Sequence, residues 1–371
     1  MKNILKILIA AAVFAANISI SANADTSAKS AILIHADTGQ VLYEHNADQQ
    51  MLIASTTKIM TALVVLENCA MDELVTVTQE HCCIEGSSMY LRTEKDYTVG
   101  DLLYGMMLVS GNDAAFCLAE HVSGSVKEFA ILMNRKAEEL GLKNTSFKNP
   151  HGLDEDGHYS SARDLAIIMA EAMKNHDFKT ITSSKHYTLH GLTYTNHNKL
   201  LWNCTGVNGG KTGYTKDAGR SLVTASERDG LNLICVTLSA PDDWRDHTAL
   251  FEKAYSEYSF FPVTSADIPK VQVISGTSPK ISVAMADELG ALVKKSDEAA
   301  FEVFLPSFIF APISQGEHAG YICITVNGQL VDSVKLVYNE NVDRLVEEAN
   351  KITIFTEIFA VSVGANTPEL M

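Results

Sequence analysis

The sequence predicts an α+β domain followed by a smaller all-β domain. Residues 30–45 and 221–240 each have the pattern of two strands joined by a short turn. The chain between them is mostly helical in its apolar spacing. Beyond Pro262 this spacing gives way to short strand-like runs with closely spaced turn residues. We therefore expect a helical block against an antiparallel sheet over 25–262, and a β-rich domain over 263–340.

The helical block is predicted from runs in which apolar residues recur every three or four positions. These runs cover residues 57–69, 99–111, 112–124, 126–141 and 161–176. The segment 144–159, rich in Asn, Gly and Pro, is expected to be a long loop. Loops of this length inside a domain are often functional.

The first 24 residues have the anatomy of a secretory signal peptide. Lys2 and Lys6 precede an apolar stretch, and Ala22-Asn23-Ala24 is a cleavage site of small residues. The alternative is a transmembrane anchor, for which an apolar stretch of about 20 residues is needed and this one is short. We expect residues 1–24 to be removed and the protein to be exported, to the outer face of the membrane or the cell wall.

Residues 341–371 are expected to form an amphipathic tail, because apolar residues recur at helical spacing from Val342 to Val363. The tail carries Arg344 and Lys351 against a larger number of acidic residues, which suits an anionic membrane surface poorly. Peripheral membrane contact through the tail remains open, beside packing on the β-rich domain or on a partner.

The composition of the chain limits the partners and metal sites that it can be expected to have. The net charge of −16 makes nucleic acid a poor partner. The seven cysteines are odd in number, offer no disulfide framework and lack the CxxC spacing typical of zinc sites. Cys117 and Cys235 stand in apolar surroundings, as small buried hydrophobic residues do.

The pair Ser55 and Lys58 opens the first helical run. A serine is a weak nucleophile until a base takes its proton. Positions three apart share a helix face, so the Lys58 amine should lie beside the hydroxyl. The apolar residues that follow would desolvate the amine and favour the neutral form that a base needs. The alternative is that Ser55 merely caps the helix.

Two further motifs follow in order. Ser110-Gly111-Asn112 lies between two helical runs, where it could present polar side chains or simply make a turn. Lys211-Thr212-Gly213 leads toward the second hairpin and is expected to start an edge strand. Each is unremarkable alone, but S-x-x-K, S-x-N and K-T-G in this order form the motif set of penicillin-recognising serine enzymes.

With these motifs the chain resembles the low-molecular-weight penicillin-binding proteins, which are serine-type D-alanyl-D-alanine carboxypeptidases. The resemblance runs from about Ser30 to Asp332 and includes MLVSGNDAAFCLAE and NGGKTGYTKDAGRSLVTA. It implies a β-lactamase/transpeptidase-like fold and removal of the last D-alanine from peptidoglycan stem pentapeptides, which limits cross-linking. It also implies covalent inhibition by β-lactam antibiotics, and no cofactor or metal.

The resemblance implies the catalytic roles. Ser55 would be the acylated nucleophile and Lys58 its base, while Ser110 would relay a proton toward the leaving D-alanine. The backbone N–H groups of Ser55 and Tyr214 would form the oxyanion hole.

The resemblance also implies the binding roles. Asn112 would hold the substrate's peptide amide, and Lys211 would add positive potential. Thr212, with Gly213 beside it in the motif, would bind the terminal carboxylate. Arg245 matches the position of a basic residue that anchors this carboxylate, a planar group suited to a guanidinium. The alternative is that Arg245 is a surface arginine.

Three alternatives remain. His151 invites a Ser-His-Asp triad, but no G-x-S-x-G elbow surrounds any serine, and the resemblance gives His151 a supporting role on a loop. A β-lactamase would use an acidic residue, such as one of 154–156, to position water. A non-catalytic penicillin or peptidoglycan sensor would acylate and barely turn over.

Overall fold

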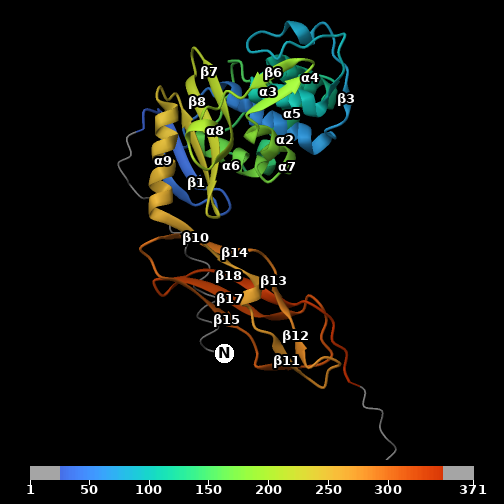
Figure 1. The fold of residues 1–371 in the computed structure, drawn as a ribbon, viewed down its shortest axis with the longest axis vertical. Helices are drawn as coiled ribbons and strands as arrows, with labels where there is room; N and C mark the ends of the chain where they lie inside the picture. The colour runs from blue at the N-terminus through green and yellow to red at the C-terminus, as the bar shows by residue number, and fades with distance from the viewer. Residues whose placement is uncertain (1–25, 346–371) are drawn as a thin grey trace, which may run out of the picture. The chain divides into compact units, whose positions relative to one another are not determined.

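The computed structural model describes residues 26–345. The expected signal peptide, and residues 346–371 of the expected tail, lie outside this part of the chain. Within it, no helix has the length and apolar character needed to cross a membrane. The backbone divides into two compact units, the first comprising 26–263, 289–302 and 323–333 and the second the remainder (Figure 1). The boundary expected after residue 262 stays a prediction, since the later strands fall in both units.

A five-stranded antiparallel sheet in the order β2-β1-β9-β8-β7 forms the centre of the first unit. Its strands are β1 (Ser30–His35), β2 (Val41–His45), β7 (Val207–Thr215), β8 (Gly219–Arg228) and β9 (Leu231–Leu238). The two predicted hairpins are confirmed and meet where β1 pairs with β9. Asp229 and Gly230 have φ angles of +51° and +78°, as a tight two-residue hairpin turn requires. The strand with the K-T-G motif, β7, lies at an edge as predicted.

The five predicted helices are confirmed, and short elements join them to the sheet. The helices of the block are α2 (Lys58–Asn68), α3 (Val99–Leu108), α4 (Asn112–Ser123), α5 (Val126–Glu139), α6 (Ala162–Ala172) and α7 (His176–Ser183). The connecting elements are η1 (Ala54–Thr57), η2 (His81–Cys83), α8 (Leu200–Asn203) and the strand pairs β3 (Leu74–Val75) with β4 (Tyr97–Thr98) and β5 (His186–Leu189) with β6 (Leu192–Thr195).

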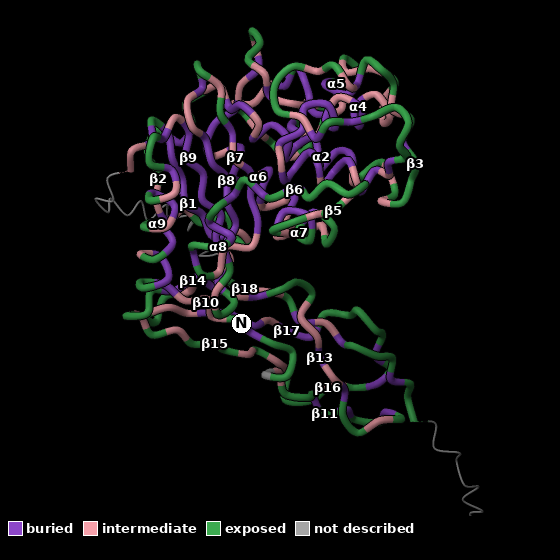
Figure 2. The backbone as a smooth tube through the Cα atoms, turned by 45° about the horizontal axis from the view of Figure 1, so that its top comes forward, coloured by how far each residue is buried: buried purple, intermediate pink, exposed green. Residues whose placement is uncertain are grey.

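Both faces of the sheet are buried, which explains why every residue of β1 is buried (Figure 2). Ile32 and Ile34 pack with the helical block, whereas Leu33 between them packs with α9 (Asp243–Glu257) on the other face. This alternation is the two-residue period of a strand. The helix α9 was not among the predicted helices, although Leu250 belongs to an apolar stripe at helical spacing on it.

From Tyr258 onward the regular structure is β-rich, in keeping with the β-rich domain predicted from residue 263. The strands are β10 (Tyr258–Val263), β11 (Val271–Ile274), β12 (Lys280–Ile281), β13 (Val283–Met285), β14 (Leu289–Lys294), β15 (Ala299–Phe304), β16 (Phe308–Phe310), β17 (His318–Val326) and β18 (Gln329–Tyr338). The tail helix expected from Val342 onward is wrong for its first residues, which are extended. Val342 bridges Ile313 and Arg344 bridges Gly276, because their backbone groups pair in extended conformation.

Candidate active site

Ser55 lies in a tight turn ahead of α2 and does not cap the helix. Neither η1 nor α2 has a side-chain cap hydrogen bond. Ala54, just before the serine, has a φ of +47°, a backbone conformation that costs energy for a residue with a Cβ. The turn brings the Ser55 Oγ to 2.9 Å from the Nζ of Lys58, the first residue of α2. The helix-cap interpretation is therefore wrong.

Lys58 is fully buried, and its Nζ has three oxygen neighbours. Besides the Ser55 Oγ, these are the Asn112 Oδ1 and the His151 carbonyl oxygen, each at 2.6 Å. Burial, and secondarily the positive charge of Lys211, hold the pKa of Lys58 well below its ordinary value. A neutral amine has two N–H groups and one lone pair. With the two carbonyl oxygens accepting the N–H groups, the lone pair faces the Ser55 hydroxyl, which is the arrangement of a base.

The turn between α3 and α4 positions Ser110 and Asn112. Ser110 has a φ of +64° and is buried. Asn112 is the first residue of α4, and its backbone N–H donates to the Ser87 carbonyl at 2.7 Å. Its Nδ2 donates to the Glu85 carbonyl at 2.7 Å, which orients the amide oxygen toward Lys58. Asn112 therefore fixes the Lys58 amine in addition to any contact with a substrate.

Lys211, on the edge strand β7, contacts the turn between α3 and α4. It is buried, and its Nζ donates to the Ser110 Oγ at 3.0 Å and to the Thr212 carbonyl at 2.8 Å. Burial lowers the pKa of Lys211 to about 7. Two residues on, a Cβ added at Gly213 would lie only 3.0 Å from the Ile53 carbonyl oxygen. Glycine at this position thus allows β7 to approach the turn that holds Ser55.

The predicted loop 144–159 approaches the Ser55 turn from the other side through its backbone. An added Cβ at Gly152, which has a φ of +86°, would overlap the Ala54 carbonyl oxygen. His151 contributes its carbonyl oxygen, while its ring Nδ1 accepts the Leu153 N–H at 3.2 Å. Burial, with the charge of Lys58, lowers the pKa of His151 to about 3. Its ring is neutral and bonds no serine or aspartate among the described residues, so the triad interpretation is wrong.

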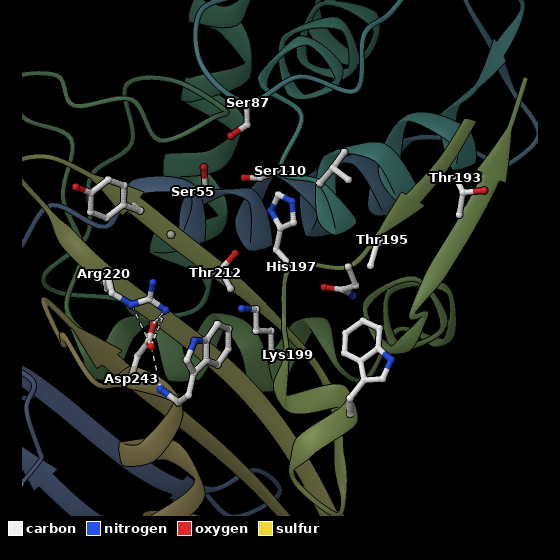
Figure 3. Close-up of a pocket in the computed structure, with 16 residues that line it drawn as sticks. Ser55, Ser87, Ser110, Thr193, Thr195, His197, Lys199, Thr212, Arg220 and Asp243 are labelled. Atoms are coloured by element: carbon white, nitrogen blue, oxygen red, sulfur yellow. Dashed lines mark hydrogen bonds and ion pairs between the residues drawn. The ribbon is translucent and has the colours of Figure 1, made fainter. Parts of the chain in front are cut away.

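Of the predicted site residues, five line a pocket of about 820 Å³, whereas Lys58, Asn112, Lys211 and His151 lie behind its surface (Figure 3). The five are Ser55, Ser110, Thr212, Gly213 and Tyr214. In Figure 3 the hydroxyls of Ser55, Ser87 and Ser110 lie along one side, and Arg220 and Lys199 lie beyond Thr212. The remaining lining residues are Val109, Thr193, Thr195, Asn196, His197, Trp202, Asp243 and Trp244. The pocket therefore combines the Ser55 hydroxyl with two cationic side chains.

The arginine of this pocket is Arg220, and the expectation for Arg245 needs correction. Arg245 does not line the pocket. Its side chain is 68% exposed and pairs with Asp242 at 3.3 Å and Asp246 at 3.6 Å. Arg220 lies on β8 opposite Tyr214, and its Nη2 donates to both oxygens of the buried Asp243 at 2.8 and 3.0 Å. Its Nη1 has no hydrogen-bond partner within residues 26–345, so it can meet a ligand.

Sequence reasoning also missed Asp113. This carboxylate is buried and accepts hydrogen bonds from the Ser88 hydroxyl at 2.6 Å and from the N–H groups of Met89 and Leu91 at 3.0 and 3.2 Å. It thereby ties the segment beside Ser87 to the start of α4. An acidic residue in a first helical turn is common, so the sequence alone does not mark it as a support of the site.

The fold and the Ser-Lys pair define a penicillin-recognising serine enzyme. The chain belongs to peptidase family S11, the D-alanyl-D-alanine carboxypeptidases. The profile of this family matches residues 17–242. The profile of the penicillin-binding protein 5 C-terminal domain matches residues 261–344. The resemblance seen in the motifs is confirmed, as is the transpeptidase-like domain followed by a β-rich domain.

Relatives match over most of their length. The D-alanyl-D-alanine carboxypeptidase DacF of Bacillus subtilis is 34% identical over 335 residues, which cover 85% of this chain and 86% of the relative. The D-alanyl-D-alanine carboxypeptidase DacC of Escherichia coli is 33% identical, covering 91% and 89%. The crystal structure of penicillin binding protein 5 from Haemophilus influenzae has a TM-score of 0.72 at 29% identity, covering 86% of this chain and 98% of that one.

Proposed function

We propose that this protein is an exported serine carboxypeptidase that removes the terminal D-alanine of peptidoglycan stem pentapeptides through an acyl-enzyme on Ser55, and so limits cross-linking. The observation that carries the proposal is the Lys58 Nζ, 2.9 Å from the Ser55 Oγ in a buried setting that favours the neutral amine. Family membership supports the same reaction class. Penicillin-binding proteins act outside the cytoplasm, consistent with an exported chain.

In the acylation step the Ser55 Oγ attacks the carbonyl carbon of the penultimate D-alanine, and the hydroxyl proton passes to the Lys58 Nζ. The negative charge that develops on the carbonyl oxygen is stabilised by the N–H groups of Ser55 and Tyr214. Asn112 and the His151 carbonyl hold the amine in place throughout, since both already contact it in the free enzyme.

Collapse of the intermediate breaks the peptide bond, and the leaving amine of D-alanine takes a proton. Ser110 can deliver it, because its hydroxyl accepts a hydrogen bond from Lys211 and can hand on its own proton. The proton that Lys58 took from Ser55 then replaces the one lost by Ser110, and Lys58 is neutral again. Water attacks the ester as Lys58 takes a proton from it, and this proton returns to the Ser55 oxygen when the shortened peptide is released. No step needs a metal or cofactor as a reactant.

The terminal carboxylate of the substrate binds on the far side of Thr212 from Ser55 in this proposal. We assign this role to the Thr212 hydroxyl and to Arg220, with Lys199 adding positive charge. Asp243 holds the Arg220 guanidinium by two oxygens and leaves Nη1 toward the pocket. The Lys199 side chain is exposed and has no ion-pair partner within the described residues. Arg245, which pairs with Asp242 and Asp246 and does not line the pocket, has no part in this role.

β-Lactam antibiotics are expected to acylate Ser55, because they resemble the acyl-D-alanyl-D-alanine bond. A β-lactamase would need a carboxylate free to position water, but Asp154, Glu155 and Asp156 border a different pocket. Of the described residues around the Ser55 pocket, Asp243 is the acidic one, and Arg220 occupies both of its oxygens. This geometry favours slow release of penicillin.

Release of D-alanine from diacetyl-Lys-D-Ala-D-Ala, measured beside covalent labelling by a fluorescent penicillin, tests the proposal. The wild-type protein should do both, and Ser55→Ala should do neither while keeping its fold. Labelling of the alanine variant would show that another residue is acylated. Labelling without D-alanine release would favour the sensor, and rapid penicillin hydrolysis would favour the β-lactamase.

A further inference from the structure

A second cluster of reactive side chains lies at the C-terminal end of α2. It is thus at the opposite end of the helix from Lys58, which is the first residue of α2. Cys69 directly follows α2, Glu73 lies on the turn before β3, and His121 belongs to the last turn of α4. Their ligand atoms lie within 4.8 Å of one another, and the His121 Nε2 is 2.9 Å from the Glu73 Oε1. The Cys69 thiol is free. None of the three residues lines the Ser55 pocket.

We propose that Cys69, Glu73 and His121 bind a thiophilic divalent cation, with Zn²⁺ as the best fit. Thiolate, imidazole and carboxylate are the three ligand types that zinc takes, and a water can complete the tetrahedron. On binding, the cysteine forms a zinc–sulfur bond and its thiol proton passes to solvent. The hydrogen bond between His121 and Glu73 is exchanged for two bonds to the metal.

The surroundings favour a cation. Cys69 and His121 both lie at helix C-termini, where the unpaired carbonyl groups carry partial negative charge. The site is also open to solvent, since the side chain of Glu73 is 46% exposed and that of His121 is 19% exposed. A metal can therefore enter without opening the core.

The backbone at the site is already fixed. The Cys69 N–H donates to the Val65 carbonyl at 2.9 Å, and the Glu73 N–H donates to the Ala70 carbonyl at 3.2 Å. The Glu73 carbonyl in turn accepts the Val99 N–H at 2.9 Å. Small side-chain rotations suffice to bring the ligands to zinc distances of about 2.0–2.3 Å. The bound metal would join the end of α2, the turn after it and α4, a structural role separate from the reaction at Ser55.

A neighbouring pair provides a matched control. His81 and Glu120 also form a histidine–carboxylate pair at 2.9 Å, and Glu120 lies on the same helix as His121. Within residues 26–345, however, no third ligand of the Cys, His, Asp or Glu type completes this pair as Cys69 completes the other. Metal binding should thus depend on His121 and not on His81.

The experiment uses the full-length protein, reduced and freed of metal, and titrates it with Zn²⁺ against a chromogenic chelator. One site of micromolar affinity or tighter is expected, and Co²⁺ should give a thiolate-to-metal charge-transfer band. Cys69→Ser should abolish the band. His121→Ala and Glu73→Gln should weaken Zn²⁺ binding by more than about 10-fold, because losing even an outer-shell partner can cost that much.

His81→Ala should bind Zn²⁺ as the wild type does, and every variant should still be labelled by penicillin, which shows that it is folded. The proposal is overturned if the wild type binds no Zn²⁺ in this range, or if Cys69→Ser and Glu73→Gln bind like the wild type. Equal losses in His81→Ala and His121→Ala would also overturn it, by showing dispersed histidine binding.

Discussion

Replacing Arg220 by glutamine should separate recognition of the carboxylate from the chemistry at Ser55. The Nη1 of Arg220 is free for a ligand, and a charge-assisted hydrogen bond is worth about 1.5–3 kcal/mol. At about 1.4 kcal/mol per tenfold, its loss lowers kcat/KM by about 10- to 150-fold. We expect Arg220→Gln to show this loss on diacetyl-Lys-D-Ala-D-Ala and little change on the same peptide with a C-terminal amide.

Arg245→Gln is the matched control. Arg245 follows Trp244 directly in the sequence, and Arg220 contacts Asp243 from β8. The side chain of Arg245 is 68% exposed, its partner Asp242 is exposed as well, and its contact with the buried Asp246 is 3.6 Å long. Ion pairs of so exposed a guanidinium contribute little. Both peptides should therefore be cleaved by Arg245→Gln as by the wild type.

The Arg220 variant also removes the partner of a buried carboxylate, so its fold must be measured. Asp243 has a side chain only 2% exposed, and leaving it unpaired should lower the free energy of unfolding by about 1–3 kcal/mol. The double variant Arg220→Gln/Asp243→Asn should recover stability in thermal unfolding without recovering kcat/KM. Recovery of kcat/KM in the double variant would refute the proposal that Arg220 binds the substrate carboxylate. Equal losses of kcat/KM on the free acid and the amide would refute it as well.

Three further outcomes follow from the site. Penicillin acylation should rise with pH as Lys58 loses its proton. Lys211→Gln should move this rise to higher pH, because burial would then lower the pKa of Lys58 without the added effect of the Lys211 charge; an unmoved pH profile would point to another base. Gly152→Ala should slow acylation and lower the melting temperature, since its Cβ would overlap the Ala54 carbonyl oxygen; wild-type values would contradict the close approach. Asp113→Asn should cost about 1–3 kcal/mol of unfolding free energy in urea, because an amide cannot accept all the hydrogen bonds that the carboxylate does; an unchanged midpoint would argue against it.

Local patterns were sufficient to predict most of the fold and the centre of the site. Ser55 and Lys58 are three positions apart, so the turn of a helix alone brings them together. The two hairpins and the helices of the block were visible because their apolar residues follow the periods of strand and helix. The edge position of β7 followed from the place of the K-T-G motif before the second hairpin.

The groups that sequence reasoning missed depend on contacts across the fold. Arg220 faces the pocket because β8 pairs with β7 in a register that sets it opposite Tyr214, and one-dimensional spacing does not reveal that register. Arg245, chosen from its place along the chain, points from α9 into solvent. His151 acts through a carbonyl oxygen, which every residue type possesses, so its identity gave no signal for that contact.

The strained backbone at Ala54 and Ser110 carries a consequence for the evolution of such a chain. Each holds a left-handed φ, of +47° and +64°, at a cost of about 1–2 kcal/mol for a residue with a Cβ. The packed helices around them must supply that free energy. Selection for heat resistance alone would favour glycine at position 110, which removes the hydroxyl that Lys211 contacts, or a relaxed turn at position 54, which would move Ser55. Activity and thermal robustness therefore pull in opposite directions at these two turns.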